Sequence, residues 1–164
     1  MGLDMYLNEK KSMYLSNRRP EHTSLTESLR EAFGTGAGDL IVTVSEERMY
    51  WRKANAIHNW FVENVQDGED DCKEYNVTYQ NLAKLKETCD EVLESRFKNP
   101  EIANELLPTK SGFFFGSTDY DENYVADLEY TSYQIDQILA KVSWDTLKDS
   151  EKGMISNYYY QSSW

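Results

Sequence analysis

A tryptophan, an asparagine and a histidine follow one another at helical spacing in the first half of the chain. Trp51, Asn55 and His58 are separated by four and three residues, so on a helix they share one face. That face is otherwise apolar, and buried polar groups need hydrogen-bond partners. Two interpretations stay open: a core histidine satisfied by Asn55 or a backbone carbonyl, or a ligand pocket with Trp51 as its aromatic wall. In the pocket interpretation, Arg52 adds a guanidinium that faces an anion.

The glycine-bounded segment 112–122, Gly-Phe-Phe-Phe-Gly-Ser-Thr-Asp-Tyr-Asp-Glu, is a second candidate site. Its glycines permit close backbone approach or positive φ. Ser117 or Thr118, followed by acids, suits a turn into a helix N-terminus, whose N–H groups could cradle an anion. The acids would repel a phosphate there and complement the helix dipole instead, so a capped strand-to-helix turn is the alternative. The predicted ligand-site residues are Trp51, Arg52, Asn55, His58, Gly112, Gly116, Ser117, Thr118 and Tyr120.

Acidic side chains recur at regular spacing on two predicted helices. The residues concerned are Glu87, Glu91, Glu94, Glu122, Glu129 and Asp136. The last three are seven residues apart, a rise of about 10.5 Å, whereas one DNA strand carries a charge about every 3.4 Å. Several such stripes together could imitate a phosphate backbone and bind a basic protein. Ordinary solvated helix faces are the simpler interpretation.

The charge balance excludes several classes of protein. The 164 residues include 29 acidic and 17 basic side chains, for a formal charge of −12. A basic nucleic-acid binder needs the opposite balance, so no direct binding to nucleic acid is expected. Two cysteines and two histidines are too few for a disulfide or zinc scaffold, and we predict no metal and no cofactor. An aromatic content of 13% argues against a disordered acidic chain.

The chain shows no signal for secretion or membrane insertion. Its first residues lack the basic segment and the apolar run of a signal peptide, and no stretch approaches 18 apolar residues. Cys72 and Cys89 are expected to be reduced thiols. These features predict a cytoplasmic protein without a membrane span.

Hydrophobic periodicity and turn-forming residues predict strands and loops in the N-terminal part. Residues 2–7 and 12–15 suggest a short hairpin around a polar turn. Residues 16–38 suggest a polar, variable loop with one helical turn, and residues 39–44 a compact strand. The Tyr- and Ser-rich tail, residues 150–164, has no clear period.

Three main helices are predicted after this strand. The first begins after Ser45 and ends near Gly68, the second begins at the N-cap Thr78, and the third begins near Asp121. The run 112–116 is expected to be a short strand. Together these elements predict one α+β domain spanning residues 1–164, with three main helices and a small antiparallel sheet.

Three segments resemble a family of small bacteriophage and prophage proteins. They are Gly-Leu-Asp-Met-Tyr-Leu at 2–7, Tyr-Trp-Arg-Lys-Ala-Asn-Ala-Ile-His at 50–58 with Trp-Phe-Val at 60–62, and the segment 112–122 described above. The resemblance covers roughly residues 1–130. It implies a phage context, with the cytoplasm of an infected bacterium as the location, and a common pocket-like core. The resemblance identifies no catalytic residues in this chain.

Three functional hypotheses follow. The first is a non-catalytic binding protein that inhibits a host defence system, as an anti-CRISPR does, by presenting its acidic surface to a basic nucleic-acid-handling host protein. The second is a protein that binds or sequesters a small anionic ligand or nucleotide in the pocket around Trp51, Asn55 and His58. The third and weakest is a small hydrolase that uses His58 with Asp119 or Glu122.

Overall fold

The computed structural model describes residues 2–16, 18–36, 38–95, 101–142 and 156–164. Their secondary structure confirms the α+β prediction, with an antiparallel four-stranded sheet in the order β2-β1-β4-β3. The strands are β1 (Asp4–Leu15), β2 (Leu40–Arg52), β3 (Tyr75–Val77) and β4 (Tyr158–Ser163). No helix in these ranges is long and apolar enough to cross a membrane.

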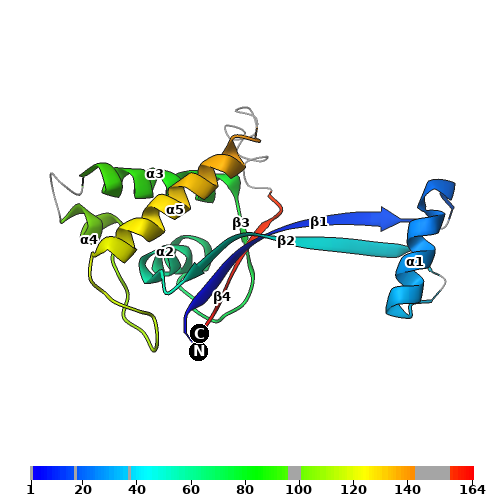
Figure 1. The fold of residues 1–164 in the computed structure, drawn as a ribbon, viewed down its shortest axis with the longest axis horizontal. Coiled ribbons are helices and arrows are strands. Elements are labelled where there is room, and N and C mark those ends of the chain that lie inside the picture. Colours follow the sequence, from blue (N-terminus) through cyan, green and yellow to red (C-terminus); the bar gives the residue numbers. More distant parts are fainter. Residues whose placement is uncertain (1, 17, 37, 96–100, 143–155) are drawn as a thin grey trace. The chain divides into compact units, whose positions relative to one another are not determined.

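The C-terminal strand β4 lies inside the sheet (Figure 1). It pairs antiparallel with β1 over six residues and with β3 over three, and Tyr160 is opposite Leu7 on one side and Tyr75 on the other. No periodicity was apparent in the sequence of this tail, of which residues 150–155 fall outside the described ranges. The described end of the tail is therefore a central structural element.

The chain forms two compact units. Unit 1 comprises Met1–Glu9 and Glu47–Trp164, and unit 2 comprises Lys10–Glu46. The prediction of one domain over residues 1–164 stays a prediction. Each unit is described below on its own.

The core of unit 1 forms between the sheet and the helix α2 (Asn55–Val65). Leu3, Met5 and Leu7 alternate along the chain and are all fully buried, as expected for one face of a strand. Phe61 of α2 stacks on Tyr160 of β4 with ring centroids 3.9 Å apart. The helix ends as predicted near Gly68, which has a φ of 81° and donates its N–H to the Val62 carbonyl.

Two long helices complete unit 1. They are α3 (Tyr79–Ser95) and α5 (Glu122–Leu139), which lie side by side, with the short α4 (Ile102–Leu106) between them in sequence (Figure 1). The predicted N-cap Thr78 and the predicted helix start near Asp121 are confirmed. The Thr78 hydroxyl accepts from the Asn81 amide, and the Asp121 carboxylate accepts from two amides of the first turn of α5.

Unit 2 contains a helix where the sequence suggested a polar loop. The helix α1 (Thr23–Phe33) follows a single 3₁₀ turn, η1 (Pro20–His22), and ends at Gly34 with a φ of 64°. Arg30 fixes the next segment by donating to the carbonyls of Gly36 and Gly38, at 2.9 and 2.6 Å. The remainder of the unit is a two-stranded ribbon of β1 and β2 residues.

Two strand predictions are wrong because local polarity concealed longer strands. No hairpin turn occurs at residues 8–11, since β1 continues through them and Glu9 pairs with Arg48 at 2.5 Å. Likewise, β2 does not stop at residue 44. It continues to Arg52, and Met49 and Trp51 are buried while their neighbours are not, which is strand alternation.

The predicted strand at residues 112–116 is also wrong. Phe114 has a φ of 62°, outside the strand region, and the Phe115 amide donates to the Gly112 carbonyl to close a turn. Phe113 and Phe114 are exposed, whereas Phe115 is buried. One phenylalanine of the three therefore belongs to the core.

Candidate functional site

Trp51 and Arg52 do not share a helix face with Asn55, because they end β2 and α2 begins only at Asn55. Trp51 is buried, and its indole N–H donates to the Thr131 hydroxyl at 2.8 Å. Arg52 is exposed, with its Nε 4.0 Å from Asp4. The predicted aromatic wall is thus a core side chain.

His58 lies in the core, and both of its ring nitrogens are occupied. Nδ1 is 2.8 Å from the Tyr160 hydroxyl and Nε2 is 3.0 Å from an Asp70 carboxylate oxygen. An ionised carboxylate only accepts, so Nε2 carries the proton and Nδ1 accepts from Tyr160. Burial lowers the pKa of His58, although Asp70 opposes this, and the neutral ring is favoured. Asp119 and Glu122 are not its partners, which removes the base that the hydrolase hypothesis required.

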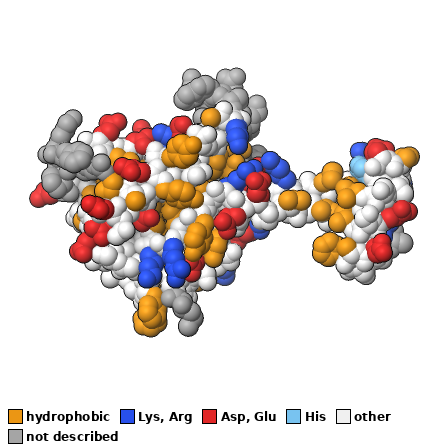
Figure 2. All heavy atoms as spheres, in the orientation of Figure 1, with side chains coloured by type: hydrophobic (Ala, Val, Ile, Leu, Met, Phe, Trp, Pro, Cys, Tyr) orange, Lys and Arg blue, Asp and Glu red, His pale blue; other side chains and the backbone are white. Residues whose placement is uncertain are grey.

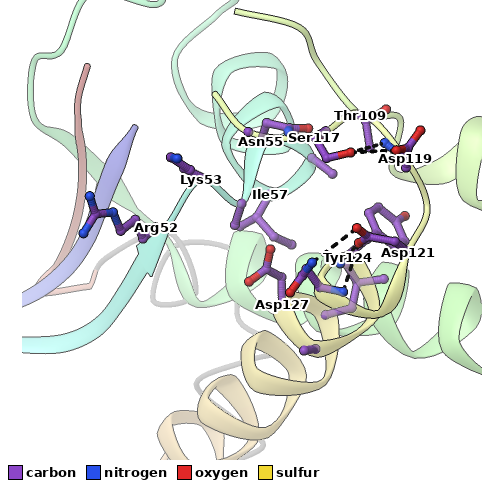
Figure 3. A pocket seen from close by; sticks show the side chains of 16 residues that line it. Arg52, Lys53, Asn55, Ile57, Thr109, Ser117, Asp119, Asp121, Tyr124 and Asp127 are labelled. Carbon is purple, nitrogen blue, oxygen red and sulfur yellow. Dashed lines mark hydrogen bonds between the residues drawn. The ribbon is translucent and has the colours of Figure 1, made fainter. Parts of the chain in front are cut away.

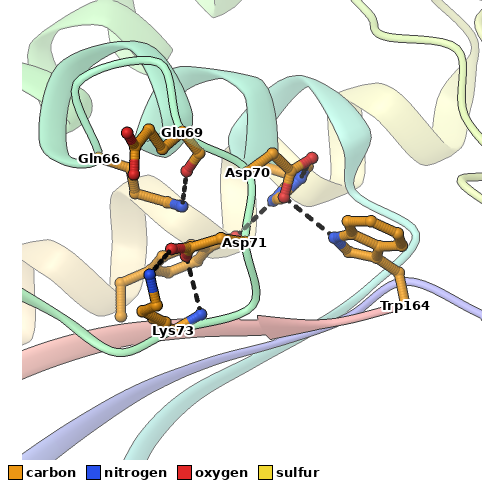
Figure 4. A network of polar contacts seen from close by, with 8 residues as sticks. Gln66, Glu69, Asp70, Asp71, Lys73 and Trp164 are labelled. Carbon is orange, nitrogen blue, oxygen red and sulfur yellow. Dashed lines mark hydrogen bonds and ion pairs between the residues drawn. The ribbon is translucent and has the colours of Figure 1, made fainter.

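The same network reaches the C-terminal residue. The Trp164 indole donates to the second oxygen of Asp70 at 3.0 Å (Figure 4). Tyr160 is completely buried, and burial raises its pKa well above the usual value, so the phenol stays neutral. The chain Tyr160–His58–Asp70–Trp164 therefore ties β4 to α2, with His58 and Tyr160 fully buried at its centre.

Asn55 holds a loop against the start of α2. Its buried amide donates to the carbonyls of Phe115 and Ser117, at 3.2 and 2.7 Å, and accepts from the Lys110 amide at 3.0 Å. Asn55 and His58 therefore do not hydrogen-bond to each other, and His58 does not line the cavity described below. Asn55 instead positions the segment that carries Gly116 and Ser117.

A cavity of about 320 Å³ opens beside this clamp, between the N-terminus of α2, the segment 109–119 and the first turns of α5 (Figure 3). Four of the nine predicted ligand-site residues line it, namely Arg52, Asn55, Gly116 and Ser117. Thr118 and Tyr120 instead hold the loop together, through bonds to Thr109 and Asn104. Gly112 is packed under the ring of Phe115.

The charged residues that line this cavity include two that were not predicted, Asp127 and Lys53. Asp127 of α5 is half-buried and lacks a hydrogen-bond or ion-pair partner within the described ranges, and burial, with a smaller effect of Asp121, raises its pKa to about 6. The Asp121 carboxylate caps α5 by accepting backbone hydrogen bonds, and the Asp119 carboxylate accepts a hydrogen bond from the Ser117 hydroxyl. Arg52 and Lys53 are the basic residues at the cavity, and both side chains point away from Asp127 (Figure 3).

The backbone around Lys53 is held in an uncommon conformation. Lys53 has a φ of 63°, and Gly116, with a φ of 95°, packs so closely that a Cβ there would be 3.0 Å from the Lys53 Cβ. The helix that follows begins with Ala54 at its N-cap and has no side-chain cap. The first-turn residues Ala56 and Ile57 line the cavity, so its wall includes an uncapped helix N-terminus.

A signal for Asp127 exists in the sequence. It lies three residues after Tyr124 and four before Thr131, so it borders the apolar stripe of α5. A carboxylate at such a position is partly buried by necessity. Lys53 offers no comparable signal, because its position depends on a left-handed backbone conformation.

Four of the six predicted acidic residues line one groove. Glu87, Glu91, Glu94 and Asp136 line a groove of about 830 Å³ between α3 and α5, together with the apolar Ala83, Leu139, Ala140 and Val142. Lys86 lies in the same groove and pairs with Asp90 at 2.7 Å. Glu122 and Glu129 are outside it.

Within the described ranges, no group of three or more His, Cys, Asp or Glu side chains is placed to hold a metal ion. The fold and the site define an α+β protein with a small polar cavity at a helix N-terminus. No protein-family model, curated protein or solved structure matches the chain.

Proposed function

We propose that the protein is a non-catalytic binding protein for a small ligand with an anionic group at one end and hydrogen-bond donors at the other, as in a nucleotide. The observation that carries this proposal is Asp127, a half-buried carboxylate without a partner within the described ranges, facing a cavity. Burying an unpaired charge costs free energy, and such groups concentrate at functional sites.

The anionic end of the ligand would lie toward Lys53 and the uncapped start of α2. An ammonium and the first-turn N–H groups of a helix without a side-chain cap are both suited to a phosphate or carboxylate. The cavity of about 320 Å³ is at the lower end of the usual range for small-molecule sites. A mononucleotide or a smaller molecule is therefore the appropriate class.

The donor-bearing end would lie against Asp127. An ionised carboxylate has only acceptors, so it favours a partner with two adjacent N–H groups. Guanine has such an edge, whereas adenine alternates a donor with an acceptor. Among nucleotides, the site is expected to prefer guanosine monophosphate (GMP) over adenosine monophosphate (AMP).

Calorimetric titration of the full chain with GMP tests this proposal. We expect a dissociation constant of about 10–100 μM. AMP, inorganic phosphate and guanosine should each bind at least about tenfold more weakly, because each lacks one of the two contacts. Absence of any heat with GMP, or equal affinity for GMP and phosphate, would contradict the proposal.

A second candidate function rests on the groove between α3 and α5. Its acidic rim and apolar floor would suit a basic amphipathic segment of a host protein, in keeping with the inhibitor of host defence that the phage resemblance suggests. The acids Glu87, Glu91, Glu94 and Asp136 would make these contacts.

Charge reversal separates this candidate from a general effect of acidity. Glu87→Lys with Glu91→Lys should weaken binding of a labelled basic amphipathic peptide more than about tenfold at low salt, measured by fluorescence anisotropy. The matched control is Glu122→Lys with Glu129→Lys, which makes the same change in charge outside the groove. Equal losses in the two variants would mean that the groove is not the binding surface.

A further inference from the structure

The strand β2 is at the edge of the sheet, and its residues in unit 2 lack the usual protection against strand addition. Residues 40–45 read Leu-Ile-Val-Thr-Val-Ser, with no charged residue and no proline. Ile41 and Val44 are 75% and 62% exposed. Natural edge strands are usually blunted by charge, proline or a bulge, so an unprotected β-branched edge favours pairing with another strand.

Unit 2 also exposes other large apolar side chains and buries few. Those exposed are Met13, Tyr14, Leu25, Phe33, Ile41 and Val44. The buried residues of the unit are Leu15, Ser16 and Thr26 within the described ranges. Figure 2 shows hydrophobic side chains gathered together on this unit. A contiguous exposed apolar area of this kind marks an interaction surface.

The charge of unit 2 indicates what covers this surface. Residues 10–46 contain five acidic and five basic side chains, so the formal charge of −12 belongs to the other residues. Two copies of the chain would repel each other through those residues, whereas unit 2 is electrically neutral. A strongly charged partner protein would form no ion pairs with residues 40–45 of β2, because none of these residues is charged.

We propose that two copies of the chain associate through unit 2, by antiparallel pairing of residues 41–45 of each β2 about a two-fold axis at Thr43. In this register Thr43 is opposite its own copy, Val42 is opposite Val44 and Ile41 is opposite Ser45. The backbone N–H and C=O groups at the open edge of each β2 then hydrogen-bond to those of the other copy, and the exposed apolar side chains are covered. The contact is isologous, as in most dimers, and is independent of the ligand cavity, which belongs to unit 1.

Sedimentation equilibrium of the full chain tests the association. The expected result is a monomer–dimer equilibrium with a dissociation constant of about 1–100 μM. Val44→Lys should weaken it at least tenfold, because the exposed edge then carries a charge, with an unchanged circular dichroism spectrum. Tyr133→Lys is the control, since Tyr133 is equally exposed on α5. A wild-type chain that stays monomeric at about 300 μM, or equal losses in both variants, would overturn the proposal.

Cross-linking tests the register independently. Directly opposed residues in an antiparallel pair are about 4.5–5.5 Å apart at Cβ, close enough for a disulfide after slight adjustment. Thr43→Cys, made with Cys72→Ser, should give a disulfide-linked dimer on mild oxidation. Cys89 should not compete, because burial raises the pKa of its thiol to about 12. Cross-linking no faster than for Tyr133→Cys in the same background would exclude the proposed pairing.

Discussion

Deletion of residues 158–164 is expected to abolish the cooperative unfolding transition of unit 1. The segment supplies β4, which is hydrogen-bonded to β1 on one side and β3 on the other. Its loss would remove Tyr160. Phe61 would then lose the ring that stacks on it in the core, and His58 would lose its hydroxyl partner. Domains are stable by only about 5–15 kcal/mol, and loss of a central strand exceeds that range.

Thermal unfolding followed by circular dichroism checks this expectation. The control is deletion of Trp164 alone, which is half-exposed and donates one hydrogen bond to Asp70. That deletion should cost about 1 kcal/mol and preserve the transition. If the chain without residues 158–164 still unfolds cooperatively near the wild-type temperature, the central position of β4 is wrong.

Asn55→Asp is expected to destabilise unit 1 by about 3 kcal/mol in denaturant unfolding at neutral pH. The amide group donates to two carbonyl oxygens, and a carboxylate oxygen in its place would be repelled by both. The bond accepted from the Lys110 amide would remain. The loss therefore comes from the contacts to residues 115 and 117, and amide exchange in this loop should accelerate.

Asn59→Asp provides the matched control on the same helix. It introduces the same charge one turn further along α2, at a position that is only partly buried. A change of less than about 0.5 kcal/mol is expected there. Similar losses at positions 55 and 59 would show that the added charge, and not the loop clamp, is responsible.

The helices were largely predictable because their signals are local. The stripe of Leu82, Leu85, Cys89 and Val92 and the caps at Thr78 and Asp121 each lie within a few residues of the helix they define. Such contacts depend on spacing along the chain and little on distant partners. The same holds for the helix stop at Gly68.

The sheet was less predictable because its polar positions are satisfied across strands. Glu9 interrupts the apolar alternation of β1, yet it pairs with Arg48 of β2. The acids after Ser45 suggested the first turn of a helix, but the partner strand β1 holds them in β2. In β4 the buried tyrosines Tyr158 and Tyr160 alternate with the less buried Tyr159, and their partners in β3 are more than 80 residues away along the chain.

The candidate site was predicted in part, for the same reason. Asn55, Gly116 and Ser117 could be identified by residue type and do meet at the cavity. The histidine at helical spacing instead has core partners, Tyr160 and Asp70, which come from distant segments. Lys53 and Asp127 line the same cavity because Lys53 adopts a left-handed backbone conformation and α5 packs against α2, and neither condition can be read from local sequence.

Comparison of wild type with Asp127→Asn tests whether the Asp127 carboxylate, which has no partner within the described ranges, serves a ligand. The raised pKa, about 6 against an ordinary 3.8, means that the folded state binds the proton more tightly than the unfolded chain. Folding free energy is then lost as the pH rises from 3.8 to 6. At pH 7.5 the asparagine variant should therefore be more stable, by about 1–2 kcal/mol, and the difference should vanish near pH 4.

The decisive measurement is the affinity for GMP of wild type, Asp127→Asn and the exposed control Glu122→Gln, with unfolding curves at pH 7.5. We expect Asp127→Asn to be more stable than wild type, to bind GMP about tenfold more weakly and to bind inorganic phosphate no more weakly. Glu122→Gln should match wild type in both measurements. If Asp127→Asn leaves both the stability and the GMP affinity unchanged, Asp127 is not a ligand-binding carboxylate.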